Sequence, residues 1–106
     1  MITEEDVEKA LAYLGDSAQE SAQWTSAKHY YDKKLKRIES LEFMKEERGA
    51  IESKRMAARA SNEYGECLED YKEATYNSTL IDAKREACRL TISYWQTYTK
   101  NKIGVY

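Results

Sequence analysis

Apolar residues recur along much of the chain at the three- and four-residue spacing of an α-helix. Between Trp24 and Leu41 they form one stripe, which holds this spacing over five turns: Trp24, Ala27, Tyr31, Leu35, Ile38 and Leu41. Such a stripe is typical of an amphipathic helix, and it predicts a long helix over about residues 17 to 47. A helix of that length needs a second element to cover its apolar side.

A short helix is predicted before the long one, over about residues 4 to 14. Thr3 precedes the acidic residues Glu4, Glu5 and Asp6, and a hydroxyl cap followed by acids is a good helix start. Gly15 is expected to end this helix, because glycine readily adopts the left-handed cap conformation. Asp16 or Ser17 is then expected to cap the long helix, with Glu20 placed to complete a capping box on Ser17.

Three further helices are predicted after residue 49, over about residues 50 to 60, 62 to 76 and 79 to 102. Gly49 interrupts the helical pattern, and the sequence leaves open whether the chain kinks or turns there, since one glycine costs a helix only about 1 kcal/mol. Ser61 and Asn62 form a clear helix start. The polar residues 77 to 79 offer a further stop and restart, which sets the two predicted helix bounds there, but the sequence leaves open whether the helix continues through Asn77.

The last predicted helix carries two neighbouring apolar stripes. One contains Leu80, Ala83, Ala87, Leu90 and Tyr94, and the other contains Ile81, Cys88, Ile92 and Trp95. A wide apolar arc suits a helix that is covered from two sides, within a bundle or between subunits. The aromatic rings of Tyr94, Trp95 and Tyr98 are expected to pack inside, because they continue these stripes.

Composition supports an all-α fold. The 106 residues include no proline and four glycines, so the strongest helix breakers are nearly absent. The length suits one domain. We therefore expect a single, elongated, antiparallel helical hairpin or bundle with long helices, in which a homodimer is one way to cover the wide apolar arcs.

Charge is unevenly distributed, although the net charge is only −2 and the isoelectric point is about 5.5. A basic run predicts a surface for a macromolecular partner or nucleic acid: Lys28, Tyr30, Lys33, Lys34, Lys36 and Arg37. An acidic run predicts a second interaction face: Glu63, Glu66, Glu69, Asp70 and Glu73. Solvated helix faces are the alternative interpretation of both runs.

The chemistry of a metal or catalytic site is not indicated. His29 is the one histidine, and Cys67 and Cys88 are 21 residues apart, which matches no metal-binding spacing. Glycine-rich phosphate loops and nucleophile elbows are missing from the sequence. We therefore expect no cofactor and no enzymatic activity. Without a basic, apolar leader or a long apolar run, we also expect no membrane association and a cytoplasmic location.

Residues 50 to 102 resemble small helical accessory proteins encoded by tailed bacteriophages. The segments that carry the resemblance are "ESKRMAARASNEYGECLEDYKEA" and "SYWQTYTKNK", and its distinctive residues are Ser61, Glu63, Tyr64 and Trp95. Gln96 departs from the pattern, which has arginine after the tryptophan. The resemblance implies an accessory role near early or recombination genes, and it implies no activity and no site residues.

These observations favour a non-enzymatic phage or prophage accessory protein that acts by binding a macromolecule, with a protein as the partner. The alternative is a nucleic-acid-associated recombination accessory protein. Salt separates the two hypotheses, because phosphate contacts release counterions and weaken steeply with salt, whereas apolar helix faces do not.

Overall fold

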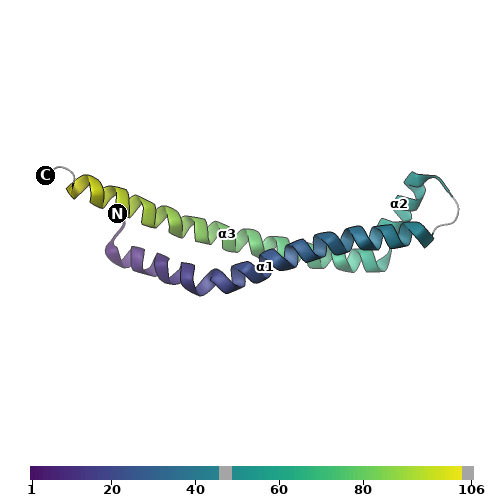
Figure 1. Cartoon of the computed structure of the whole chain (residues 1–106), viewed down its shortest axis with the longest axis horizontal. Helices are drawn as coiled ribbons and strands as arrows, with labels where there is room; N and C mark the ends of the chain where they lie inside the picture. The colour runs from purple at the N-terminus through teal and green to yellow at the C-terminus, as the bar shows by residue number, and fades with distance from the viewer. Residues whose placement is uncertain (46–48, 104–106) are drawn as a thin grey trace. The chain divides into compact units, whose positions relative to one another are not determined.

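The computed structural model describes residues 1–45 and 49–103, and nearly all of these residues are helical. The helices are α1 (Glu4–Lys45), α2 (Ile51–Arg59) and α3 (Asn62–Ile103) (Figure 1). The described residues contain no strand. The predicted all-α fold class is therefore confirmed, and its two long helices contain 42 residues each.

The chain divides into two compact units. Unit 1 combines Met1–Ala22 with the chain from Thr79 onward, and unit 2 is Gln23–Ser78. Within each unit, a segment of α1 lies antiparallel to a segment of α3, and α2 belongs to unit 2 (Figure 1). The purple start of α1 thus lies beside the yellow-green end of α3.

Thr3 caps α1 as predicted. Its hydroxyl oxygen accepts a hydrogen bond from the Asp6 amide at 3.2 Å, while the Thr3 amide donates to Oδ2 of Asp6 at 2.8 Å. This reciprocal pair satisfies two backbone donors that the first turn of a helix would otherwise leave without a partner. The hydrogen bond from the Thr3 backbone to the carboxylate, followed by the hydrogen bond of the carboxylate with the Thr3 side chain, holds the pKa of Asp6 below its ordinary value of 3.8.

Acid is expected to loosen this N-terminal cap. Because the pKa of Asp6 is lower in the folded chain than in the unfolded chain, the cap contributes stability above pH 3.8, and that stability is lost as the pH falls through the folded pKa. The protection of the amides of residues 3 to 7, measured by NMR as the exchange rate relative to that of an unstructured chain at the same pH, should therefore fall more between pH 5 and pH 2 than protection at the centre of α1. In an Asp6→Asn variant, this local acid response should disappear; its persistence would show that Asp6 does not cause it.

Gly15 does not end a helix, and Ser17 does not cap one, so both predictions were wrong. α1 runs through both residues. Packing explains the difference. Ser17 is 5% exposed, and the Arg85 guanidinium from α3 donates to the Leu14 carbonyl at 2.7 Å and to the Ser17 hydroxyl at 2.8 Å. These contacts offset the small helical penalty of a glycine.

Residues 77 to 79 also remain helical, so the predicted break between residues 76 and 79 was wrong. The Asn77 side chain donates to the Glu73 carbonyl one turn back at 2.9 Å, and Ser78 is buried at 4% exposure. Polar residues that favour turns when exposed are thus accommodated within the helix by a local hydrogen bond and by burial.

A real break occurs at Gly49, which has a φ of +114°. This backbone conformation is costly for residues with a Cβ atom, and it separates α1 from α2. The end predicted for the long helix near residue 47 lies outside the described residues. After α2, the Ser61 hydroxyl accepts a hydrogen bond from the Tyr64 amide at 3.2 Å, which confirms the predicted start of α3.

Buried and half-buried positions alternate at spacings of three and four along both long helices. In unit 1 they include Val7, Ala10, Leu14 and Ser17 on α1, and Ile81, Arg85, Cys88, Ile92 and Trp95 on α3. In unit 2 they include Trp24, Lys28, Tyr31, Leu35 and Ile38 on α1, and Tyr64, Cys67, Tyr71, Ala74 and Ser78 on α3. This is the seven-residue repeat of a coiled-coil seam.

The core of unit 2 is small. Leu35, Ile38 and Cys67 are 8%, 4% and 2% exposed, and half-buried side chains surround them: Tyr31, Tyr64, Leu68 and Tyr71. The Cys67 thiol lies 3.8 Å from the Tyr31 carbonyl, to which it donates. Leu35, Ile38 and Cys67 therefore form one apolar cluster between the two long helices.

Candidate macromolecular binding surfaces

Half of the predicted basic surface gathers in one groove of unit 2. Tyr30, Lys34 and Arg37 line this groove, which we call the basic groove, and its other lining residues are Ile38 and Leu41 from α1 and Glu63 from α3. Tyr30, Lys34, Arg37 and Leu41 follow one another at spacings of four, three and four, so they lie on one side of α1. The groove therefore presents positive charge together with apolar surface.

Tyr30 and Leu41 supply the apolar surface of the basic groove. Tyr30 is 60% exposed and Leu41 is 50% exposed. The edge-to-face contact between the Tyr30 and Tyr31 rings, with centroids 5.2 Å apart and planes at 70°, helps to position the exposed ring. An exposed ring held in this way can contact either a protein side chain or a nucleobase.

The remaining predicted basic residues lie outside the groove. Lys33 is exposed and follows Tyr30 by three residues, so it borders the same side of α1. Lys36 contacts Asp32 at 3.4 Å and lines another hollow, beside Phe43 and Arg55. Lys28 is half-buried at a seam position. The six residues of the basic run thus do not form one continuous surface.

All five residues of the predicted acidic face are exposed on α3. Their spacings of three and four place them along one side of the helix, as predicted. Glu69 contacts Lys72 at 3.5 Å, and Glu63 lines the basic groove beside Lys34 and Arg37. The acidic and basic predictions therefore meet at Glu63, and the groove has mixed charge.

Cys67 lies within the seam and is only 2% exposed. Burial raises the pKa of its thiol, and this effect exceeds the opposing effect of the Lys34 charge. A thiol that is buried and protonated is a poor nucleophile. The position of Cys67 is consistent with a packing role.

Ion pairs near the end of α1 connect it to α2. Glu39 accepts contacts from Arg55 at 3.7 Å and from Arg59 at 3.4 Å. The Lys54 ammonium lies 5.4 Å from the centre of the Phe43 ring, within cation–π range. Residues 54 to 59 contain three cations and no acidic residue, which indicates a basic surface. The sequence does not indicate that Glu39 is the carboxylate with which the two arginines pair.

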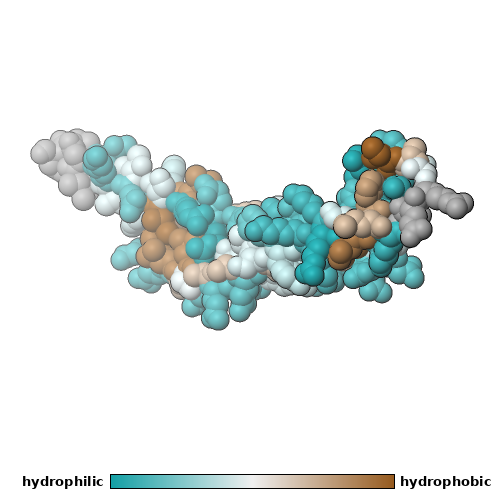
Figure 2. All heavy atoms as spheres, turned by 45° about the vertical axis from the view of Figure 1, so that its right-hand side comes forward, coloured by the Kyte–Doolittle hydropathy of each residue, from teal (hydrophilic) through white to brown (hydrophobic). Residues whose placement is uncertain are grey.

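Exposed hydrophobic side chains in this part of unit 2 were not predicted as a surface. Met44, Ile51 and Met56 are 77%, 65% and 70% exposed, and Figure 2 shows brown residues gathered around α2. The absence of a regular spacing among these residues explains why the sequence did not mark them.

The first apolar stripe of α3 is exposed in unit 1. We call its members Leu80, Ala83, Ala87, Leu90 and Tyr94 the outer stripe. Leu80, Leu90 and Tyr94 are 39%, 60% and 62% exposed, and both alanines are exposed. The expectation that the final aromatic rings all pack inside was wrong for Tyr94 and for Tyr98, which is 41% exposed; Trp95 is half-buried.

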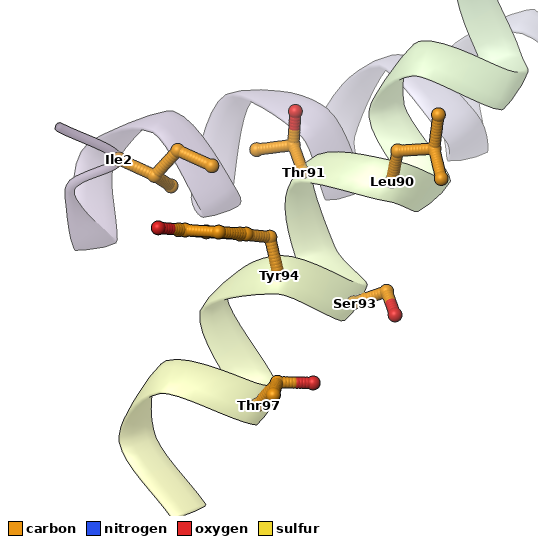
Figure 3. A pocket seen from close by; sticks show the side chains of 6 residues that line it. All are labelled: Ile2, Leu90, Thr91, Ser93, Tyr94 and Thr97. Atoms are coloured by element: carbon orange, nitrogen blue, oxygen red, sulfur yellow. The ribbon is translucent and has the colours of Figure 1, made fainter. Parts of the chain in front are cut away.

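A hollow in unit 1 borders the outer stripe. Leu90 and Tyr94 line it together with Ile2, Thr91, Ser93 and Thr97. Figure 3 shows the Tyr94 side chain extending from α3 toward Ile2, near the start of α1, and Figure 2 shows hydrophobic residues gathered on the left side of the molecule, where α3 ends. The outer stripe therefore borders a hollow that has room for side chains of a partner.

No group of three or more histidine, cysteine, aspartate or glutamate side chains in residues 1–45 and 49–103 is arranged to hold a metal ion. Within the same described ranges, no helix has the length and apolar character needed to cross a membrane. Compared with known proteins, the chain matches no family model, no curated protein and no solved structure.

Proposed function

We propose that the chain is a non-enzymatic accessory protein that acts by binding another protein through the basic groove. The observation that carries this proposal is the mixed surface formed by Lys34, Arg37, Tyr30, Leu41 and Glu63. Tyrosine and arginine are enriched where protein interfaces gain most of their binding energy. A protein segment with acidic and apolar side chains would complement this surface.

A protein partner is favoured over nucleic acid because carboxylates accompany the cations. Glu63 lines the groove itself, and Glu66, Asp70 and Glu73 are exposed on the same helix. At a Debye length of about 8 to 10 Å in physiological salt, such charges oppose the approach of a phosphate backbone. The net charge of −2 acts in the same direction.

The alternative function is that of a nucleic-acid-associated recombination accessory protein. Exposed Lys33 and Arg37 could contact phosphates while the Tyr30 ring stacks on a base. The phage or prophage setting and the cytoplasm of the host bacterium as the location are both proposed from the resemblance of residues 50 to 102 to phage accessory proteins.

Binding assays with the Lys33→Glu/Arg37→Glu variant should separate the two functions. We expect the tagged wild-type chain to retain a specific protein from host cells with little dependence on salt, and we expect the variant to lose it. The matched control is Lys84→Glu/Lys100→Glu, which makes the same change in charge at exposed sites in unit 1 and should retain the partner.

Fluorescence anisotropy of labelled single- and double-stranded DNA tests the nucleic-acid alternative. Binding at low salt that weakens steeply as salt is raised, and that is lost in the Lys33→Glu/Arg37→Glu variant but kept in the control, would replace the protein-binding proposal with the recombination alternative. A variant and a control that bind every partner equally would remove the basic groove as the site.

A further inference from the structure

The outer stripe of α3 lies away from the side of the helix that packs on α1. In unit 1, the α3 side chains that pack on α1 are Ile81, Arg85, Cys88, Ile92 and Trp95. Because each residue turns a helix by about 100°, Leu80, Ala83, Ala87 and Leu90 point to nearly the opposite side. The spacings of the outer stripe are three, four, three and four, which is the spacing that a neighbouring helix fits.

The outer stripe has a second property, which is that the order of its first four members reads the same in both directions. About residue 85, Ala83 corresponds to Ala87 and Leu80 corresponds to Leu90. Further out, Thr79 corresponds to Thr91 and Tyr76 to Tyr94, whereas the residues between these pairs differ. In a two-fold antiparallel pair, a residue that contacts a second residue of the other copy receives the same contact in return. The order of this stripe would therefore place alanine against alanine and leucine against leucine.

We propose that a second copy of this chain covers the outer stripe, with the two α3 helices antiparallel and the two-fold axis beside residue 85. In this register, Leu80 of each chain faces Leu90 of the other, and Ala83 faces Ala87. Small alanines at the centre allow two helix backbones to approach closely, and leucines on both sides of them exclude water. The hollow beside Leu90 and Tyr94 gives the interface room for side chains of the second copy.

A copy of the same chain fits the symmetry better than an unrelated helix does. An unrelated partner needs apolar residues at matching spacings, but it does not require the stripe to be symmetric about its own centre. In a pair of copies, the order of Leu80, Ala83, Ala87 and Leu90 brings side chains of equal size together in every layer of the interface. The proposal concerns a different surface from the basic groove and does not depend on the function proposed above.

Charges beside the stripe predict how salt affects the dimer. Lys84 and Glu86 lie on its two sides and are exposed, and near the two-fold axis each would lie close to its own copy. Salt screens repulsion between like charges, so raising the salt concentration should leave the dimer intact or strengthen it. Nucleic-acid binding would respond in the opposite direction.

Sedimentation equilibrium of the whole chain tests the dimer. We expect the wild type to be dimeric over a concentration series, and we expect Leu80→Glu/Leu90→Glu to raise the dissociation constant by roughly a hundredfold or more, since four charges would enter an apolar interface. Leu11→Glu/Met56→Glu is the control, because both side chains are well exposed, at 54% and 70%, and lie outside both the stripe and the basic groove. Circular dichroism should show equal helix content in all three proteins.

Cross-linking of mixed chains tests the orientation without altering the leucines. In a Cys88→Ser background, a chain carrying Thr79→Cys is mixed with a chain carrying Ser93→Cys, both of which are exposed positions on one border of the stripe. A short bifunctional thiol reagent should link the two different chains. Thr79→Cys alone should not link to itself, because in this register residue 79 faces residue 91 of the other chain, so the two copies of residue 79 would be separated by 12 residues, about 18 Å.

Three results would overturn the proposal. One is a wild-type chain that remains monomeric at every concentration. Another is a Leu80→Glu/Leu90→Glu variant that dimerises as tightly as the wild type. The third is efficient self-linking of Thr79→Cys, which would indicate a parallel pair or another interface. Because none of these substitutions changes the basic groove, failure of the dimer would leave the test of protein binding unaffected.

Discussion

Replacing Ile38 with alanine is expected to lower the free energy of unfolding by about 3 kcal/mol. Ile38 is 4% exposed and belongs to the three-residue core of unit 2, beside Leu35 and Cys67. The substitution removes buried methyl and methylene groups and leaves a space that the two long helices can fill only in part. Since domains of this size are stable by about 5 to 15 kcal/mol, the loss should be obvious in urea denaturation followed by circular dichroism.

Leu41→Ala is the matched control for this core prediction. Leu41 is one turn further along α1 and is 50% exposed, so its truncation should cost less than about 1 kcal/mol. If Ile38→Ala and Leu41→Ala lowered the free energy of unfolding equally, the buried cluster around Ile38 would contribute no more stability than an exposed side chain does. A variant at Ile38 that unfolds like the wild type would contradict the packing of this core.

Replacing Arg85 with methionine is expected to destabilise unit 1 by about 2 kcal/mol. The Arg85 guanidinium donates at 2.7 Å to the Leu14 carbonyl and at 2.8 Å to the Ser17 hydroxyl, and Ser17 is 5% exposed. Hydrogen bonds from charged groups contribute about 1.5 to 3 kcal/mol to stability. We expect a value inside this range and not at its upper end, because Arg85 is only half-buried and solvent screens its charge. Methionine keeps the length of the aliphatic chain but donates no hydrogen bond.

A double-mutant cycle with Ser17→Ala separates this contact from general effects of the arginine. If the contact is responsible, the combined variant should lose less stability than the sum of the two single variants. Lys84→Met removes a neighbouring exposed cation and should have little effect. Simple additivity between Arg85→Met and Ser17→Ala would show that the two side chains do not interact in solution.

The sequence was sufficient for the fold class because its strongest signals act over many residues. Regular apolar spacing and the lack of proline predicted two long helices, and the caps at Thr3 and Ser61 formed as expected. Its errors came from local stop signals. Gly15 and Asn77 were interpreted as breaks, but both lie within long helices, where contacts with the rest of the unit outweigh small local preferences.

The candidate sites were predictable only as far as one helix determines them. Spacing along α1 correctly joins Tyr30, Lys34 and Arg37 on one side, and the same reasoning separates Lys36 from them. Glu63 enters the basic groove from α3, and no sequence pattern connects it with residues 30 to 37. The partner of Arg55 and Arg59 was missed for the same reason, because Glu39 precedes them on another helix.

The reactivity of the two cysteines can report how often α1 and α3 separate. Cys67 is buried in the core of unit 2, and its thiol is protonated because burial raises its pKa, whereas Cys88 is half-buried in unit 1. A thiol reagent should therefore modify Cys88 in the native chain, but it should modify Cys67 only during the brief moments when the helices of unit 2 separate. The rate of labelling at Cys67 thus reports how often α1 and α3 part, and a bound partner that bridges these helices would slow it.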